Sequence, residues 1–272
     1  NVAIGLTSLA TNTTGGDNTA VGAEALRLNV GGTRNSAVGR NALEANTSGG
    51  DNTGMGTNAL LLNTTGSDNT AFGADSLDSN TTASNNTAVG SGAMAANTTG
   101  CRNVAVGSLA LDSNTTACGN TAVGYRGLDA NTTGAENTAV GKGAMTNNTT
   151  GQQNTAVGAN VMLCNTTGQY NSAFGFQAMN RITDSEGNTG IGYQSLYTNT
   201  TGDANTAVGR DALVSNTTAN NNTAVGKDSL KANTTAASNV AVGQGALQAN
   251  TTALNNTAVG RVAGNKTTTG CQ

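Results

Sequence analysis

Short apolar runs alternate with Asn, Thr and Gly along the whole chain, and this alternation returns every 17 residues. One copy of the pattern reads N-T-A-V-G-x-x-A-L-x-x-N-T-T-G-x-x, and sixteen copies account for all 272 residues without an insertion or deletion. The first Asn and the fifth-position Gly stand in every copy, for example Asn1, Asn18, Asn35 and Asn120, and Gly5, Gly22 and Gly124. A fixed period of this kind is typical of repeat architectures.

The apolar runs predict strands. Ala122-Val123 and Gly127-Leu128 are too short for a helix, and Gly recurs too often for helix interiors. We expect two or three short strands per copy, separated by Asn and Gly corners. With one coil per copy and about 4.8 Å between coils, sixteen coils make a rod of roughly 77 Å. The pattern therefore predicts an all-β chain, a parallel β-solenoid of sixteen 17-residue coils. We expect residues 1–272 to be a single repeat array and part of a longer one.

Stacking in register places each residue above its equivalent 17 positions away. Asn side chains in such a row can hydrogen-bond from coil to coil, which satisfies amides that would be costly to bury unpaired. We assign this ladder role first to Asn1, Asn18, Asn35 and Asn120, and second to Asn12 and its equivalents. The Gly positions, Gly5, Gly22 and Gly124, are interpreted as turns, while Val123 and Leu128 represent apolar rows.

Both faces of the predicted strand are apolar. Ala122 and Val123 are neighbours, and adjacent strand residues point to opposite faces. One face would fill the lumen of the coil, and the other is available to a partner chain. We therefore expect three chains to associate laterally; a single-chain solenoid with a lumen of Val, Leu and Thr is the alternative.

Composition excludes several classes of function. Aromatic residues make up only 3% of the chain, which favours a thin, linear core stabilised by contacts between neighbouring repeats. The 12 basic and 15 acidic residues form no basic stripe, so we expect no nucleic-acid partner. The segment has no run of 18 apolar residues, so we expect no membrane insertion within it.

The residues needed for common catalytic chemistry are missing. The chain has no His, its carboxylates are scattered over different copies, and its four Cys lack C-x-x-C spacing. These features remove the commonest general base, a paired acid and base, and a zinc site. We expect neither an enzyme nor a cofactor.

Two cysteines share a repeat position. Cys101 and Cys118 are 17 residues apart, so their Cα atoms would be about 4.8 Å apart, within the range that a disulfide accepts. Such a disulfide would place the protein in an extracellular, oxidising compartment. The alternative is two small residues at a tolerant surface position. Cys271 has the same repeat position, whereas Cys164 does not.

The Asn-Thr-Thr triplets match the N-glycosylation sequon. Candidate acceptors are Asn12, Asn63, Asn80 and Asn114. Alternatively, the same triplet only builds a corner of the coil. Full occupancy is sterically implausible, because the glycans would be only about 4.8 Å apart.

The copy from residue 171 to 187 departs furthest from the pattern and lies among most of the aromatic residues. Phe176 and Tyr193 share a repeat position and are expected to stack on the outer surface. A candidate contact patch comprises Tyr170, Phe176, Tyr193 and Tyr197. Local repacking is the alternative interpretation of this copy.

The N-V-A-I-G of residues 1–5, the N-S-A-V-G of residues 35–39 and the many N-T-A-V-G copies resemble the S-x-A-x-G-type repeats of trimeric autotransporter adhesin heads. Similar repeats occur in phage tail fibres. The resemblance implies a left-handed parallel β-roll, three chains packed side by side, and a role in adhesion to surfaces. It implies no particular binding residues.

Two functional hypotheses follow. The first is an extracellular structural or adhesive fibre that associates with itself, as a lateral homotrimer or an end-to-end filament, and contacts a host or environmental surface. The second is an ice-binding solenoid that presents rows of Thr, such as Thr13, Thr64, Thr81 and Thr115.

Overall fold

The computed structural model describes residues 1–268, and these residues form strands and turns but no helix. The described residues divide into two compact units, of which the first is Asn1–Glu136 and the second begins at Asn137. The boundary falls at the end of the eighth 17-residue copy, so each unit corresponds to eight copies.

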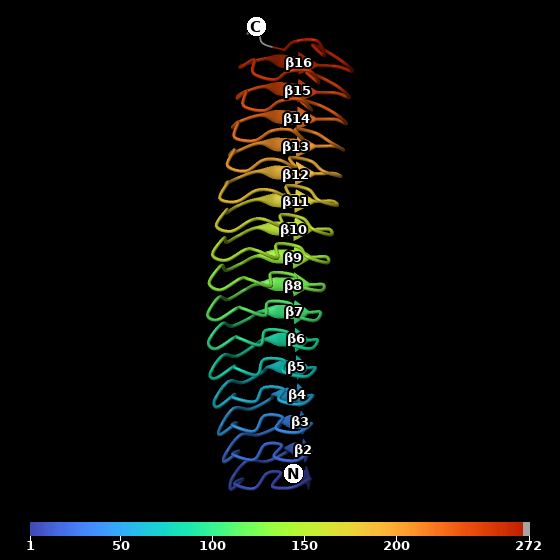
Figure 1. Cartoon of the computed structure of the whole chain (residues 1–272). Helices are drawn as coiled ribbons and strands as arrows, with labels where there is room; N and C mark the ends of the chain where they lie inside the picture. Colours follow the sequence, from blue (N-terminus) through green and yellow to red (C-terminus); the bar gives the residue numbers. More distant parts are fainter. Residues whose placement is uncertain (269–272) are drawn as a thin grey trace. The chain divides into compact units, whose positions relative to one another are not determined.

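Every copy contributes one three-residue strand, which begins at its second residue (Figure 1). The first unit contains β1 (Val2–Ile4), β2 (Thr19–Val21), β3 (Ser36–Val38), β4 (Thr53–Met55), β5 (Thr70–Phe72), β6 (Thr87–Val89), β7 (Val104–Val106) and β8 (Thr121–Val123). The second unit contains β9 (Thr138–Val140), β10 (Thr155–Val157), β11 (Ser172–Phe174), β12 (Thr189–Ile191), β13 (Thr206–Val208), β14 (Thr223–Val225), β15 (Val240–Val242) and β16 (Thr257–Val259).

Within each unit, neighbouring strands pair in parallel and in strict register. Ala20 pairs with Ala37 in the first unit, and Ala207 pairs with Ala224 in the second, each at a separation of 17 residues. One copy is therefore one coil, and the predicted all-β parallel β-solenoid is confirmed.

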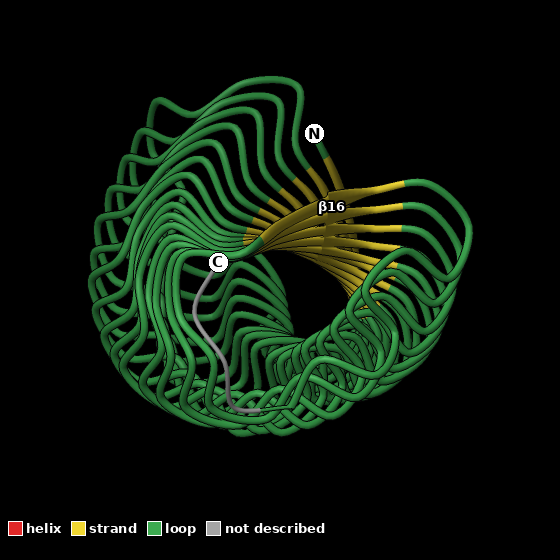
Figure 2. Cartoon of the chain, turned by 90° about the horizontal axis from the view of Figure 1, so that it is seen from above, coloured by secondary structure: helices red, strands yellow, loops and turns green. Residues whose placement is uncertain are grey.

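The rest of each coil is turn and loop (Figure 2). After the strand, residues seven and nine of most copies adopt a left-handed backbone, as in Glu24 (φ 62°) and Leu26 (φ 52°). The N–H of Arg27 donates to the carbonyl of Glu24, and the N–H of Asn29 to that of Leu26, so two tight turns follow each other. A strand needs negative φ. The expectation of two or three strands per copy is therefore wrong, and each copy has one.

The fifth-position Gly is required by stacking as well as by the turn. Gly22 has a φ of 138°, and a Cβ placed on it would be 2.4 Å from the carbonyl oxygen of Gly39 in the next coil. Gly5 has the same relation to Gly22, also at 2.4 Å, and Gly124 has a φ of 130°. A side chain at Gly5, Gly22 or Gly39 would therefore overlap the backbone of the neighbouring coil.

The interior of the coil is lined by Ala, Leu or Met, and Asn. Ala122 and Leu128 are fully buried, whereas 36% of Val123 is exposed on the outer side of β8. The alternative of a lumen of Val, Leu and Thr is therefore wrong for the fourth-position Val, which lies outside the coil. The interior of most coils also holds the Leu or Met side chain of the ninth residue, so little room remains and a small Ala side chain points inward from the strand.

Candidate functional site

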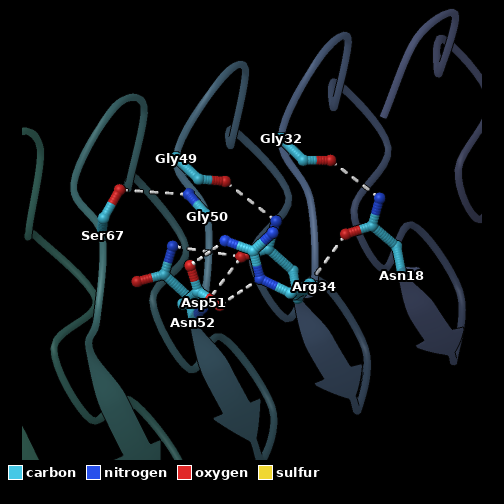
Figure 3. Close-up of polar contacts among 9 residues, drawn as sticks. Asn18, Gly32, Arg34, Gly49, Gly50, Asp51, Asn52 and Ser67 are labelled. Carbon is cyan, nitrogen blue, oxygen red and sulfur yellow. Dashed lines mark hydrogen bonds and ion pairs between the residues drawn. The ribbon is translucent and has the colours of Figure 1, made fainter. Parts of the chain in front are cut away.

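The first Asn of each copy joins adjacent coils, and it is buried in every copy except the first. Asn18 Oδ1 accepts the backbone N–H of Asn35 at 2.9 Å, and Asn18 Nδ2 donates to the carbonyl of Gly32 at 2.8 Å (Figure 3). Asn120 repeats the arrangement with the carbonyl of Gly134. Asn1, in the first coil, is exposed, but its Oδ1 accepts the N–H of Asn18. These amides satisfy backbone groups at the corner that precedes each strand.

The second Asn, which is present in fourteen of the sixteen copies, forms the more direct amide ladder. Asn63 Nδ2 donates to Asn46 Oδ1 at 2.9 Å and to the carbonyl of Gly66 at 2.9 Å. Asn80 Nδ2 then donates to Asn63 Oδ1 at 2.8 Å, so the chain of amides continues from coil to coil. The predicted Asn ladder is confirmed, and the side-chain-to-side-chain bonds are most regular in the row that the sequence pattern ranks second.

The candidate glycosylation sites belong to this second row. Asn63, Asn80 and Asn114 are fully buried, and Asn12 is half-buried. The Nδ2 atom, to which a glycan would be attached, donates two hydrogen bonds in Asn63, Asn80 and Asn114. A glycan at these atoms would require the coil to open, so the folded array leaves no room for it.

The ladder is interrupted in the most divergent copy. Ile182 replaces the second Asn and is fully buried. Asn165 Oδ1, which would accept an amide at that position, is buried without a hydrogen-bond partner. Asn250 Oδ1 is left in the same state one coil before Thr267. Each interruption thus leaves one orphaned carbonyl oxygen inside the coil.

We define the outer strand face as the second and fourth residues of every copy. They flank the middle strand residue, which is a buried Ala or Gly in every strand except β1, and they point outward, as the burial of β8 shows. Across the sixteen copies these positions contain only Thr, Ser, Val, Ile, Met and Phe, without a single charged residue. The exposed members include Val38, Met55, Phe72, Val106, Val123, Phe174 and Ile191. Each unit therefore presents an uncharged, largely apolar strip.

In the Thr rows proposed for ice binding, the side-chain hydroxyl groups donate hydrogen bonds to backbone carbonyls of the next coil. Thr64 Oγ1 donates to the carbonyl of Thr81 at 3.0 Å, and Thr81 Oγ1 to that of Thr98 at 3.1 Å. Thr13 and Thr115 make the equivalent bonds at 3.3 Å. These hydroxyl protons are directed along the coil stack and not toward solvent. The Thr that follows, for example Thr65 or Thr116, is exposed.

The aromatic residues of the candidate contact patch form two separate contacts. Phe176 and Tyr193 stack with ring centroids 5.9 Å apart and an angle of 13° between planes, which confirms the expected stacking. They remain 45% and 47% exposed. The guanidinium of Arg181 lies 5.4 Å from the ring centroid of Tyr197. Tyr170 is also exposed.

Cys101 and Cys118 are free thiols with their Sγ atoms 2.6 Å apart. The predicted register of the two residues is confirmed, whereas the disulfide stays a prediction. Cys164 is also a free thiol, and Cys271 lies outside the described residues. Among residues 1–268 no group of three metal-ligating side chains occurs.

Comparisons with models of known protein families and with curated proteins found no match to this chain. The described part of the chain contains no helix that is long and apolar enough to cross a membrane.

Proposed function

We propose that the chain is part of an extracellular structural or adhesive fibre, in which the solenoid coils supply a scaffold and the outer strand face associates with further copies. The absence of charge from this face carries the proposal. None of its 32 positions holds a charged residue, whereas charged residues occur elsewhere on the surface. The extracellular location rests on the resemblance of the N-T-A-V-G copies to adhesin and fibre repeats.

The size of the strip supports an interaction surface. Eight strands spaced by about 4.8 Å, each about 10 Å long, give roughly 350 Å² per unit. Contiguous apolar patches of about 300–600 Å² are the largest on a typical soluble monomer and are often functional. Valine and phenylalanine side chains on this strip are partly exposed, for example Phe72 and Val106. Their burial between copies would provide the driving force for association.

The test compares two triple variants of the first unit. Replacing Val89, Val106 and Val123 by Asp places three charges on the outer strand face. We expect sedimentation to show a shift from oligomers to monomers with the strand signal retained. The control replaces the exposed Thr82, Thr99 and Thr116 by Asp and should leave the assembly unchanged. A wild-type chain that sediments as a folded monomer at all accessible concentrations would overturn the proposed self-association.

Ice binding is the second candidate, now through the outer strand face. Thr residues such as Thr87 and Thr121 alternate with Val at about 6.6 Å along the strand and repeat at about 4.8 Å between coils, which makes a regular grid of hydroxyl and methyl groups. Thermal hysteresis of the purified monomer tests it. The substitution Thr121→Tyr should abolish the activity, whereas Thr116→Tyr, on the exposed row outside the strands, should preserve it. Absence of hysteresis in the wild-type chain eliminates this candidate.

A further inference from the structure

We propose that Cys101 and Cys118 are a reactive thiol pair that exchanges with low-molecular-weight disulfides and thereby forms a reversible link between neighbouring coils. The two Sγ atoms are 2.6 Å apart, and both side chains are partly exposed at the surface of the first unit. This site is independent of the outer strand face and of the proposed fibre function.

The fold, and not only the chance proximity of two side chains, holds the sulfur atoms together. Both cysteines are the sixteenth residue of their copies. Several side chains of this row accept the backbone N–H of the residue 17 positions earlier. Ser67 Oγ accepts from Gly50 at 3.1 Å, and Ser84 Oγ accepts from Ser67 at 3.0 Å.

Cys118 follows the same rule as the serines. Its Sγ accepts the N–H of Cys101 at 2.9 Å. The Cys118 sulfur is thereby held against the residue that carries the other thiol. Because paired coils repeat at one strand spacing, this proximity is maintained for as long as the two coils remain stacked.

The two thiols are not equivalent. The contact with Cys118 lowers the pKa of Cys101, and Arg102 acts in the same direction. Burial raises the pKa of Cys118, and its hydrogen bond with Cys101 acts in the same direction. The thiolate is the nucleophile in thiol–disulfide exchange. Cys101 is therefore assigned as the attacking thiol and Cys118 as the resolving thiol.

The exchange proceeds in two balanced steps with oxidised glutathione as the oxidant. The Cys101 thiolate attacks one sulfur of glutathione disulfide, the disulfide bond of the reagent breaks, and one glutathione leaves as a thiolate that takes a proton from solvent. Cys118 then loses its proton and attacks Sγ of Cys101, and the second glutathione leaves. Two protein thiols are oxidised and one glutathione disulfide is reduced to two thiols.

The chain supplies its own controls. Cys164 is a partly exposed thiol at the eleventh position of its copy, so it reports the reactivity of a cysteine outside the sixteenth-residue row. Serine occurs naturally in the row of Cys101 and Cys118, at Ser67 and Ser84. The substitutions Cys101→Ser and Cys118→Ser are therefore compatible with the coil, and circular dichroism checks that the fold is retained.

The experiment treats the reduced full chain with oxidised glutathione and follows each cysteine by peptide mapping under non-reducing conditions. We expect a Cys101–Cys118 cross-link in the wild-type chain, and a stable glutathione adduct on Cys101 in the Cys118→Ser variant. Cys101 should react at least about tenfold faster than Cys164. In Cys101→Ser, the adduct on Cys118 should form more slowly than the Cys101 adduct of the other variant. The proposal is overturned if no cross-link forms, or if Cys101 reacts no faster than Cys164.

Discussion

The two units have the same interior and different exteriors. Both stack Ala, Leu or Met, Gly and two Asn in register, as Asn63 shows in the first unit and Asn216 in the second. The first unit has 5 basic and 10 acidic residues, a net charge of −5, whereas the second has 7 basic and 5 acidic residues, a net charge of +2. Five of the seven aromatic residues also belong to the second unit.

This difference teaches which positions the solenoid constrains. An exposed pair such as Arg34 and Asp51, whose charged atoms are 2.6 Å apart (Figure 3), contributes about 0 to 1 kcal/mol, so its loss or replacement is tolerated. A side chain inside the coil packs against its equivalents in two neighbouring coils, so a change there disturbs three coils at once. Substitutions in the interior rows should therefore change the free energy of unfolding by similar amounts in both units, whereas substitutions in the outer rows should not.

The largest effect is expected in the Gly row. Gly39→Ala in the first unit and Gly209→Ala in the second combine a left-handed φ with an approach below 3 Å to the next coil. Each should lower the free energy of unfolding by about 4 kcal/mol. Chemical denaturation measures the effect. Gly16→Ala is the control, because a Cβ there meets no atom within 4 Å, and it should stay within about 0.5 kcal/mol of the wild type. Unequal effects of Gly39→Ala and Gly209→Ala would contradict a shared interior.

The second Asn row should give the next largest effect. Asn63→Ala and Asn216→Ala each remove two donated amide bonds and leave buried partners unsatisfied. We expect the free energy of unfolding to fall by about 2–4 kcal/mol in either unit, measured by denaturation. Thr65→Ala, at an exposed position beside the row, is the control. An Asn variant as stable as this control would show that the ladder contributes little.

Repairing the interruption in the second unit should stabilise it. In Ile182→Asn, the new Nδ2 can donate to the orphaned Oδ1 of Asn165, and its Oδ1 can accept from Asn199 Nδ2. We expect a gain of about 1 kcal/mol, since satisfying these buried polar atoms outweighs the apolar packing that the isoleucine side chain provides. Ile182→Val, which only removes a methyl group, should instead destabilise the chain by about 0.5–1.5 kcal/mol. Both variants are compared by thermal unfolding, and a destabilised Asn variant would argue against the repair.

The smallest effect concerns pH and the first unit alone. Burial raises the pKa of Asp112, and the neighbouring charges of Asp129 and Asp78 add to this shift. An acid whose pKa is higher in the folded state costs stability at neutral pH, and that cost disappears as the pH falls through the folded pKa toward the ordinary value of 3.8. Asp112→Asn should therefore stabilise the chain at pH 7 and have no effect at strongly acidic pH. Denaturation at several pH values tests this, and a difference that does not depend on pH would exclude the titration of Asp112 as its cause.

The sequence by itself determined the repeat and its consequences. A constant period makes residues 17 apart equivalent, so the parallel register, the Asn ladders, the Gly row and the proximity of Cys101 to Cys118 all follow from the period alone. These inferences need only that coils stack in phase.

The tertiary structure alone decided which way the side chains face and where the strand ends. Ala122 and Val123 are both compatible with a strand interior, and only the path of the coil places Ala122 inside and Val123 outside. That path depends on the left-handed backbone of the ninth residue, where Leu128 has a φ of 52° although leucine disfavours this conformation by roughly 1–2 kcal/mol. Full burial of the Leu128 side chain, which contributes about 1.5–3 kcal/mol, offsets this cost. The local propensity of leucine therefore predicts the wrong backbone, because packing against neighbouring coils stabilises the left-handed conformation by more than the conformation costs.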